Sequence, residues 1–201
     1  MRLAAKPTSL VVIGASAGGI EALSKVLQGL PRSFPAAVVV VQHRLPNKES
    51  ILATILGRQT ILPVVEARDG EALEAGTVYI ARPDQHLTVT SSGRFAYHDG
   101  QRIRHVLSSA NPLFASAANT FGAQAIGVVL TGSGADGTDG VQAIKGRGGI
   151  VIAQDRATSE RFEMPGSAIA SGAVDQVLPL EDIAPALVRA ATIHSRPKRQ
   201  T

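Results

Sequence analysis

Three residues whose side chains can act together in acyl-transfer chemistry each follow an apolar run of the sequence: Ser16, His43 and Asp136. A serine hydrolase uses this set of groups: the hydroxyl attacks a carbonyl carbon, the imidazole takes the hydroxyl proton, and the carboxylate orients the imidazole. The three residues lie far apart along the chain. We therefore expect them to work together only if the fold places the ends of the three runs side by side.

Ser16 lies in a glycine-rich motif. Residues 14–18 read Gly-Ala-Ser-Ala-Gly and fit G-x-S-x-G, the tight strand-to-helix turn that exposes a nucleophilic serine. The glycines permit the turn because they carry no Cβ. The backbone N–H groups of Ala17 and Gly18 would then be free at a helix start, where they could stabilise an oxyanion. The alternative is a simple turn in which Ser16 only caps the helix, and the motif alone does not decide between the two.

A strand, a glycine-rich turn and a helix also describe a nucleotide-binding site, which is the rival functional interpretation. The dinucleotide fingerprint G-x-G-x-x-G fails here because Ser16 stands where the second glycine is needed for the pyrophosphate. The second apolar run ends in Gln42 and His43 rather than in an acidic residue for the ribose. No Gly-Lys-Ser/Thr follows the turn, so a Walker A loop is absent as well.

His43 and Asp136 are favoured by position over the other histidines and a neighbouring aspartate. His43 comes at the end of a central strand candidate. The other histidines lie in or beside a predicted insertion, or near the C-terminus: His86, His98, His105 and His194. Asp136 lies nearer the preceding strand than Asp139, which could instead cap or line the next helix. The order Ser–His–Asp differs from the Ser–Asp–His order of the α/β-hydrolase fold and argues against an ordinary lipase or esterase.

Short apolar runs alternate with amphipathic stretches, which indicates repeated βαβ units. Strands are predicted at 9–13, 37–41, 63–66, 125–130, 149–153 and 174–178. Helices are predicted at 18–30, 50–56, 112–121, 137–145, 165–170 and 180–191. Three strands at 77–80, 87–90 and 94–97, joined by Pro-Asp and Ser-Gly turns, indicate an antiparallel hairpin insertion over about 77–105. The fold class is α/β, a doubly wound and mostly parallel sheet in three layers, αβα. In such a sheet, residues that follow different strands share one edge.

Composition bounds the class of protein. The 201 residues suit a single domain, and 44% hydrophobic with 18% charged residues excludes a disordered chain. The chain has no cysteine, which excludes disulfides, thiolate metal sites and a cysteine nucleophile. No apolar run approaches the ~20 residues that span a bilayer, and no secretory signal is present. We therefore expect a cytoplasmic protein without membrane insertion.

The net charge of +4 and the pI near 9.8 come from the chain ends. Five cations and no acidic residue lie near the termini: Arg2, Lys6, Arg196, Lys198 and Arg199. The rest of the chain is close to neutral, and aromatic residues are only 3%, so stacking platforms for single strands are scarce. We expect a basic tail over 1–9, a catalytic domain over 10–192, a basic tail over 193–201, and no nucleic-acid partner.

Around Ser16, His43 and Asp136 the sequence closely resembles the catalytic domain of the chemotaxis protein-glutamate methylesterase, CheB. The resemblance spans about residues 10–191 and rests on ordered motifs. They are Ile13-Gly-Ala-Ser-Ala-Gly-Gly19, Val40-Val-Gln-His43, Tyr79-Ile-Ala-Arg-Pro-Asp-Gln-His86, Ser109-Ala-Asn-Pro-Leu-Phe114, Leu130-Thr-Gly-Ser-Gly-Ala-Asp-Gly137, Ala153-Gln-Asp155 and Met164-Pro165. The family's triad carries over as Ser16, His43 and Asp136.

This resemblance implies hydrolysis of glutamyl methyl esters on the cytoplasmic signalling helices of chemoreceptors, with release of methanol, and also deamidation of receptor glutamines in some members. It implies no metal and no organic cofactor. The partners implied are methylated chemoreceptors and a separate receiver or other chemosensory regulator. Classical members carry an N-terminal receiver domain, which we expect this chain to lack because it begins just before the first strand. The alternative is a catalytically weak module of the same fold that binds receptors.

Two positions beside the predicted oxyanion site depart from the family pattern. Ala17 stands where well-known members have threonine, and Ser133 where they often have methionine. Both are expected to affect specificity more than catalysis. The hairpin region also carries three arginines next to His98 and His105: Arg94, Arg102 and Arg104. They are either a solvated loop or a cationic rim that steers an acidic receptor helix towards Ser16.

Overall fold

The computed structural model describes residues 7–43, 51–99 and 108–195, with only the backbone described for His194 and Ser195. Seven strands form the main sheet: β1 (Leu10–Ala15), β2 (Ala37–Gln42), β3 (Val64–Glu66), β4 (Val78–Ile80), β7 (Ala125–Val129), β8 (Ile150–Gln154) and β9 (Gln176–Leu178). Their order is β3-β4-β2-β1-β7-β8-β9, and every neighbouring pair is parallel. Two further strands, β5 (His86–Val89) and β6 (Phe95–His98), pair as an antiparallel hairpin.

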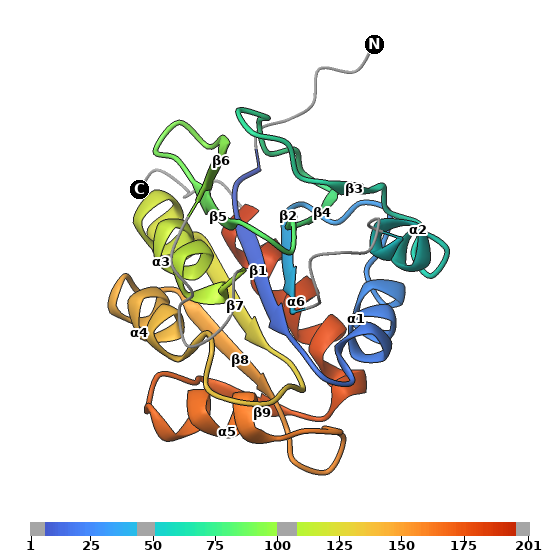
Figure 1. Cartoon of the computed structure of the whole chain (residues 1–201), viewed down its shortest axis with the longest axis vertical. Coiled ribbons are helices and arrows are strands. Elements are labelled where there is room, and N and C mark those ends of the chain that lie inside the picture. The colour runs from blue at the N-terminus through green and yellow to red at the C-terminus, as the bar shows by residue number, and fades with distance from the viewer. Residues whose placement is uncertain (1–6, 44–50, 100–107, 196–201) are drawn as a thin grey trace.

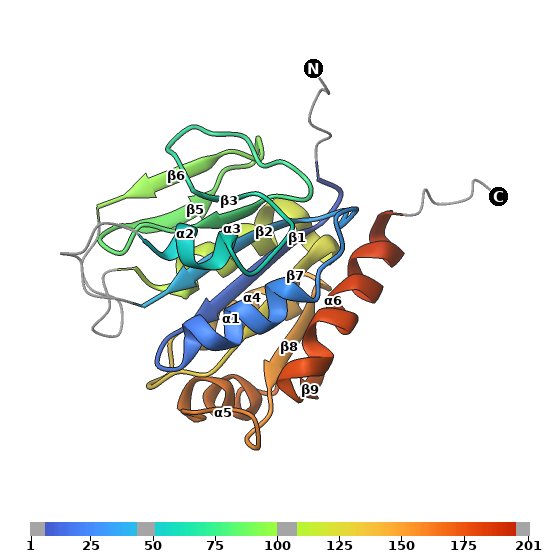
Figure 2. The same cartoon turned by 90° about the vertical axis from the view of Figure 1, so that its right-hand side faces the viewer.

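Helices cover both faces of this sheet (Figures 1 and 2). They are α1 (Gly19–Gln28), α2 (Leu52–Gly57), α3 (Ala110–Phe121), the 3-10 helix η1 (Gly122–Gln124), α4 (Thr138–Gly146), α5 (Glu163–Ala170) and α6 (Leu180–Ser195). One core contains buried residues of α1, α2 and α6, and a second contains buried residues of α3, α4, α5 and the hairpin. The predicted three-layer α/β fold with a hairpin insertion is confirmed. No helix within the described ranges has the length and apolar composition of a bilayer-spanning segment.

The central strands serve both cores because successive side chains of a strand point to opposite faces. In β1, Val11 and Ile13 pack on the α1 side, whereas Leu10 and Val12 pack on the α3 side. Every residue of β1 and β2 is buried. This burial on both faces explains why these strands appear in the sequence as continuous apolar runs.

The order of the strands reverses at β1. The chain first builds one side of the sheet through β2, β3 and β4, then crosses over to place β7 against the other side of β1. Loops that leave the carboxyl ends of β1 and β7 therefore run in opposite directions and open a crevice between them, where α/β sheets bind ligands. We call the side of the sheet where the parallel strands end the carboxyl edge, and the side where they begin the amino edge.

Three sequence predictions are wrong at their boundaries. The insertion does not begin at 77, because β4 is a parallel strand between β2 and β3. A strand of three residues is too short to show whether both of its faces are covered, and Val78 and Tyr79 pack in different cores. The two predicted tails, 1–9 and 193–201, extend too far into the folded domain. Ser9 is buried directly before β1, and α6 continues to Ser195. Residues 100–107 of the predicted insertion lie outside the described residues.

Candidate active site

Ser16 begins the turn between β1 and α1. Its N–H donates to the carbonyl oxygen of Thr131 at 3.0 Å, which ties the end of β1 to the end of β7. Its carbonyl oxygen accepts from the N–H of Gly19 at 2.8 Å. The residue that caps α1 is Gly18, in the left-handed region at φ 73°, and no side chain caps this helix. The capping interpretation of Ser16 is therefore wrong, and within the described residues its hydroxyl takes part in no hydrogen bond.

His43 follows β2 directly beside Ser16. Ala15 is the register partner of Gln42, and the N–H of His43 donates to the carbonyl oxygen of Ala15 at 3.0 Å. Ser16 and His43 are thus the next residues along two neighbouring strands, which lie about 4.8 Å apart in a sheet. The Gln42 side chain also connects the ends of β1 and β2, since its Nε2 donates to the carbonyl oxygen of Ser16 at 2.7 Å.

Asp136 reaches His43 from the loop after β7. Nε2 of the imidazole lies 2.8 Å from Oδ2 of the carboxylate, with side-chain exposures of 12% for His43 and 4% for Asp136. The loop turns through Gly134 and Gly137, both at positive φ, so that the aspartate points back over the strand ends. Asp139, its rival in the sequence, lies in the first turn of α4 and is exposed. Since Nε2 faces Asp136, Nδ1 is the imidazole nitrogen left for proton transfer.

The Asp136 carboxylate is held in its ionised form by hydrogen bonds. Burial alone raises the pKa of a carboxyl group, but three donors outweigh this effect and hold the pKa of Asp136 below its usual value. The donors are the His43 ring, the N–H of Ala110 at 2.7 Å and the hydroxyl of Ser109 at 2.5 Å. Ala110 is the first residue of α3, whose N-terminus also favours a negative charge. The anionic carboxylate can therefore stabilise a protonated His43.

Backbone donors beside Ser16 remain available to a ligand. Within the described ranges, the N–H groups of Ala17, Gly18 and Ser133 donate to no protein group. Ser133 is exposed in the loop that leads to Asp136. Gly132, just before it, packs so closely against Ser16 that a Cβ would lie 2.8 Å from the Ser16 Cβ. The predicted oxyanion residues thus lie on two turns that pack against each other at Ser16.

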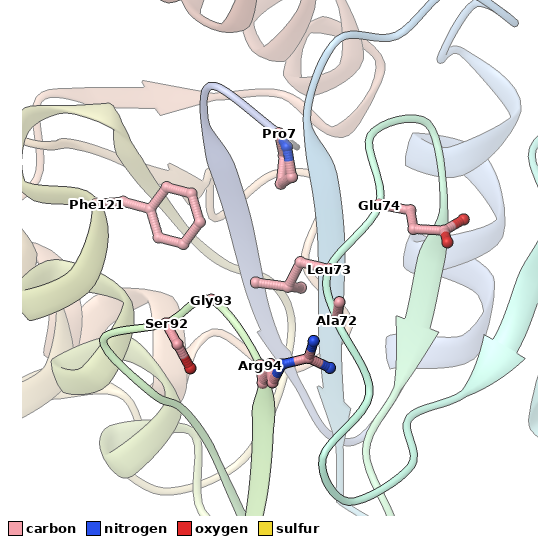
Figure 3. Close-up of a pocket in the computed structure, with 8 residues that line it drawn as sticks. All are labelled: Pro7, Ala72, Leu73, Glu74, Ser92, Gly93, Arg94 and Phe121. Atoms are coloured by element: carbon pink, nitrogen blue, oxygen red, sulfur yellow. The ribbon is translucent and has the colours of Figure 1, made fainter. Parts of the chain in front are cut away.

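Arg94 does not lie with these residues, so its predicted steering role is corrected. Its Nη1 donates to the carbonyl oxygen of Gly70 at 2.9 Å. It lines a hollow of about 260 Å³ with Pro7, which precedes β1, and Phe121, which ends α3 (Figure 3). These neighbours place Arg94 at the amino edge, at the end of the hairpin turned away from Ser16. Arg102 and Arg104 lie outside the described residues.

Sequence reasoning missed Ser109 and His86. Ser109 is the N-cap of α3 and donates to Asp136, while its own N–H donates to Nδ1 of His86 at 3.2 Å. A signal for Ser109 was present, because a serine three residues before Pro112 is typical of a helix start. No local signal for His86 exists, since its contact depends on where β5 meets α3.

Comparison with known proteins identifies the family of this chain. The family model for the CheB methylesterase domain matches residues 11–187. The chain belongs to the CheB methylesterase family. The CheB methylesterase catalytic domain of Thermotoga maritima, a solved structure, matches with a TM-score of 0.88 and 39% identity, covering 90% of this chain and 97% of that one.

Two curated relatives extend the comparison within the CheB family. A protein-glutamate methylesterase/protein-glutamine glutaminase of Anaeromyxobacter dehalogenans is 46% identical over 89% of this chain. The protein-glutamate methylesterase FrzG of Myxococcus xanthus is 42% identical over 91% of it. These matches cover 52% and 55% of the two relatives, so the chain spans about half the length of the curated proteins it matches.

Proposed function

We propose that this chain is a serine hydrolase that demethylates glutamyl methyl esters of chemoreceptors, with Ser16 as nucleophile, His43 as base and Asp136 as the group that orients the base. The supporting observation is the part-buried hydrogen bond of 2.8 Å between His43 and Asp136, next to Ser16, in a CheB methylesterase fold. Relatives named protein-glutamate methylesterases supply the reaction and the substrate class.

The reaction proceeds by acyl transfer. Nδ1 of His43 takes the proton of the Ser16 hydroxyl while Oγ bonds to the ester carbonyl carbon, whose π electrons move to the oxygen. Asp136 stabilises the imidazolium that forms. The C–O bond to the methoxy group then breaks, and His43 returns the proton to release methanol. In the second half, His43 takes a proton from water, the hydroxide attacks the acyl-enzyme, and Ser16 leaves with that proton to give the glutamate side chain.

The oxyanion of each tetrahedral intermediate is stabilised by backbone donors. The N–H groups of Ala17, Gly18 and Ser133 lie on the two turns that flank Ser16 and have no acceptor in the described protein. A fixed donor of this kind contributes about 100- to 1,000-fold to the rate of acyl transfer. The side chains at 17 and 133 are a half-buried alanine and an exposed serine, both short, so specificity at this rim rests on backbone shape more than on side-chain bulk.

Glutamine deamidation follows the same steps with ammonia as the leaving group, and the name of the Anaeromyxobacter relative includes a glutaminase. The proposed substrate surface is the cytoplasmic helices of methylated chemoreceptors, which places the protein in the cytoplasm. A receiver or another chemosensory regulator is the proposed partner that controls it.

Methanol release from a methylated receptor tests the proposal. We expect Ser16→Ala to lower the rate at least about 1,000-fold, because it removes the attacking oxygen. Ser24→Ala is the matched control, since the Ser24 hydroxyl donates only to the carbonyl oxygen of Ile20 within α1. Equal rates for the wild type and Ser16→Ala would contradict the proposal. Receptor binding without methanol release by either chain would favour the alternative of a binding module.

A further inference from the structure

The hydrogen bonds around Asp136 continue beyond the proposed triad. Oδ2 of the carboxylate accepts from the His43 ring and from the N–H of Ala110, whereas Oδ1 accepts from the hydroxyl of Ser109. The carboxylate is therefore held at both oxygens, and it cannot rotate without breaking one of these bonds. Ser109 is fully buried, so bulk water does not compete for its hydrogen bond to Asp136.

The hydroxyl of Ser109 has two tasks that fix its direction. As the N-cap of α3, its oxygen accepts from the N–H of Asn111 at 3.2 Å. Its single hydrogen is then directed to Oδ1 of Asp136 at 2.5 Å. A hydroxyl has one donor and can accept as well, so both bonds are satisfied together. The start of α3 and the Asp136 carboxylate are thus held by the same oxygen atom.

The hairpin holds Ser109 in turn. His86, the first residue of β5, is buried and accepts the N–H of Ser109 on Nδ1 at 3.2 Å. A continuous series of hydrogen bonds therefore runs from the hairpin through Ser109 and Asp136 to His43. The hairpin lies outside the parallel sheet, and this series links it to the site.

We propose that Ser109 is a positioning residue for the reaction: its hydroxyl fixes the Asp136 carboxylate towards His43, and His86 fixes Ser109. This inference rests on the proposed function. The bland alternative is that Ser109 only caps α3. The two differ in what they require, because a cap needs only a residue compatible with the helix start, whereas positioning needs an O–H aimed at Oδ1.

Replacement of Ser109 by glycine and by threonine separates these two roles. Glycine is nearly as good an N-cap as serine but has no hydroxyl. We expect Ser109→Gly to lower kcat for methanol release about 10- to 100-fold, the effect of losing one hydrogen bond to a charged group, with KM within about twofold. Ser109→Thr keeps the hydroxyl and should retain kcat within about threefold.

Asn111→Ala is the matched structural control. Its side chain accepts from the N–H of Gly140 at 2.9 Å and joins α3 to α4 without touching Asp136. We expect it to lower the thermal midpoint while kcat stays within about twofold of the wild type. If Ser109→Gly keeps the wild-type kcat, or if Asn111→Ala loses as much kcat as Ser109→Gly at equal folded fraction, the positioning role is wrong.

A second pair of variants tests the same series should Ser109→Gly fail to fold. His86→Asn retains an acceptor near the position of Nδ1, and His86→Ala does not. We expect His86→Ala to lower kcat more than His86→Asn, with KM unchanged for both, and equal kcat in the two variants would overturn the role of His86. A failure of the proposed function is distinguishable, because methanol release would then not depend on Ser16 at all.

Discussion

The carboxyl and amino edges of the parallel sheet each carry charged residues, but they use them differently. At the carboxyl edge, Asp136 is buried and accepts from three donors on two separate segments: the imidazole of His43 after β2, and Ser109 and Ala110 at the start of α3. At the amino edge, Arg94 donates to the backbone carbonyl oxygen of Gly70. Figure 3 shows Leu73 and Phe121 around the hollow that Arg94 lines. A hollow alone therefore does not mark a reactive site. What indicates a reactive site is a candidate nucleophile, a candidate base and an ionised carboxylate that lie close together.

Breaking the hydrogen bond between His43 and Asp136 at the carboxyl edge is expected to have the largest effect. Asp136→Asn should lower kcat for methanol release about 1,000- to 10,000-fold, because an amide neither stabilises the imidazolium nor holds the correct tautomer. The measurement is steady-state methanol release on a methylated receptor. Asp139→Asn, at the exposed first turn of α4, should stay within about twofold. A similar loss in both variants would contradict the assignment of Asp136.

Filling the space behind Ser16 is expected to have the next largest effect. A Cβ at Gly132 would lie 2.3 Å from the Met164 sulfur and 2.8 Å from the Ser16 Cβ. Gly132→Ala should therefore destabilise the fold by about 1–3 kcal/mol and displace the serine turn, with at least about a tenfold loss of kcat. Urea unfolding and methanol release measure the two effects.

Gly146→Ala is the control for this substitution. Gly146 ends α4 with open space around its Cβ position, so alanine there should leave stability unchanged or raise it by up to about 1 kcal/mol. Equal unfolding free energies for Gly132→Ala and the wild type would contradict the prediction. They would show that the turn at Ser16 and the turn at Gly132 can move apart without loss of stability.

Acidification should reduce the contribution of Asp136 to the free energy of unfolding. The pKa of Asp136 is lower in the folded than in the unfolded chain, where an aspartate titrates at about 3.9. Its contribution to stability is therefore complete above that value and is lost as the pH falls through the lower folded pKa. We expect the difference in unfolding free energy between wild type and Asp136→Asn, measured by urea titration, to shrink as the pH falls from 6 towards about 3. A difference that is constant or grows with acid contradicts this sign.

The smallest effect is expected at the amino edge. Arg94→Ala removes a cation on the far side of the sheet, so kcat/KM on the receptor and its salt dependence should stay within about twofold of the wild type. The steering role of Arg102 and Arg104 stays a prediction. The double charge reversal Arg102→Glu with Arg104→Glu should lower kcat/KM at low salt and flatten its salt dependence. A larger effect of Arg94→Ala than of this double variant would reverse the distinction between the two edges.

The sequence predicted the long central strands well because burial on both faces leaves an uninterrupted apolar signal, as in β1 and β2. Ser16, His43 and Asp136 followed from the rule that loops at the carboxyl ends of parallel strands meet. The short strand β4 was misassigned, because three residues carry no period that separates a parallel from an antiparallel strand.

Arg94, Ser109 and His86 show where sequence reasoning stops. Alternation identifies a hairpin but not which of its ends faces the site, so His86 and Arg94 could not be assigned to opposite edges. The role of Ser109 depends on a contact between the start of α3 and a loop that comes much later in the chain. Such contacts follow from packing in three dimensions, which no local pattern records.

The reversal of strand order at β1 divides the proposed machinery between two stretches of chain. Ser16 and His43 belong to the stretch before residue 100, and Asp136 and Ser109 to the stretch after residue 107. The two stretches meet where β1 pairs with β7. Neither stretch carries a complete reacting set, so a chain cleaved between them would regain turnover only when the fragments associate. Esterase activity would then report reassembly of the sheet, as in a split-enzyme assay.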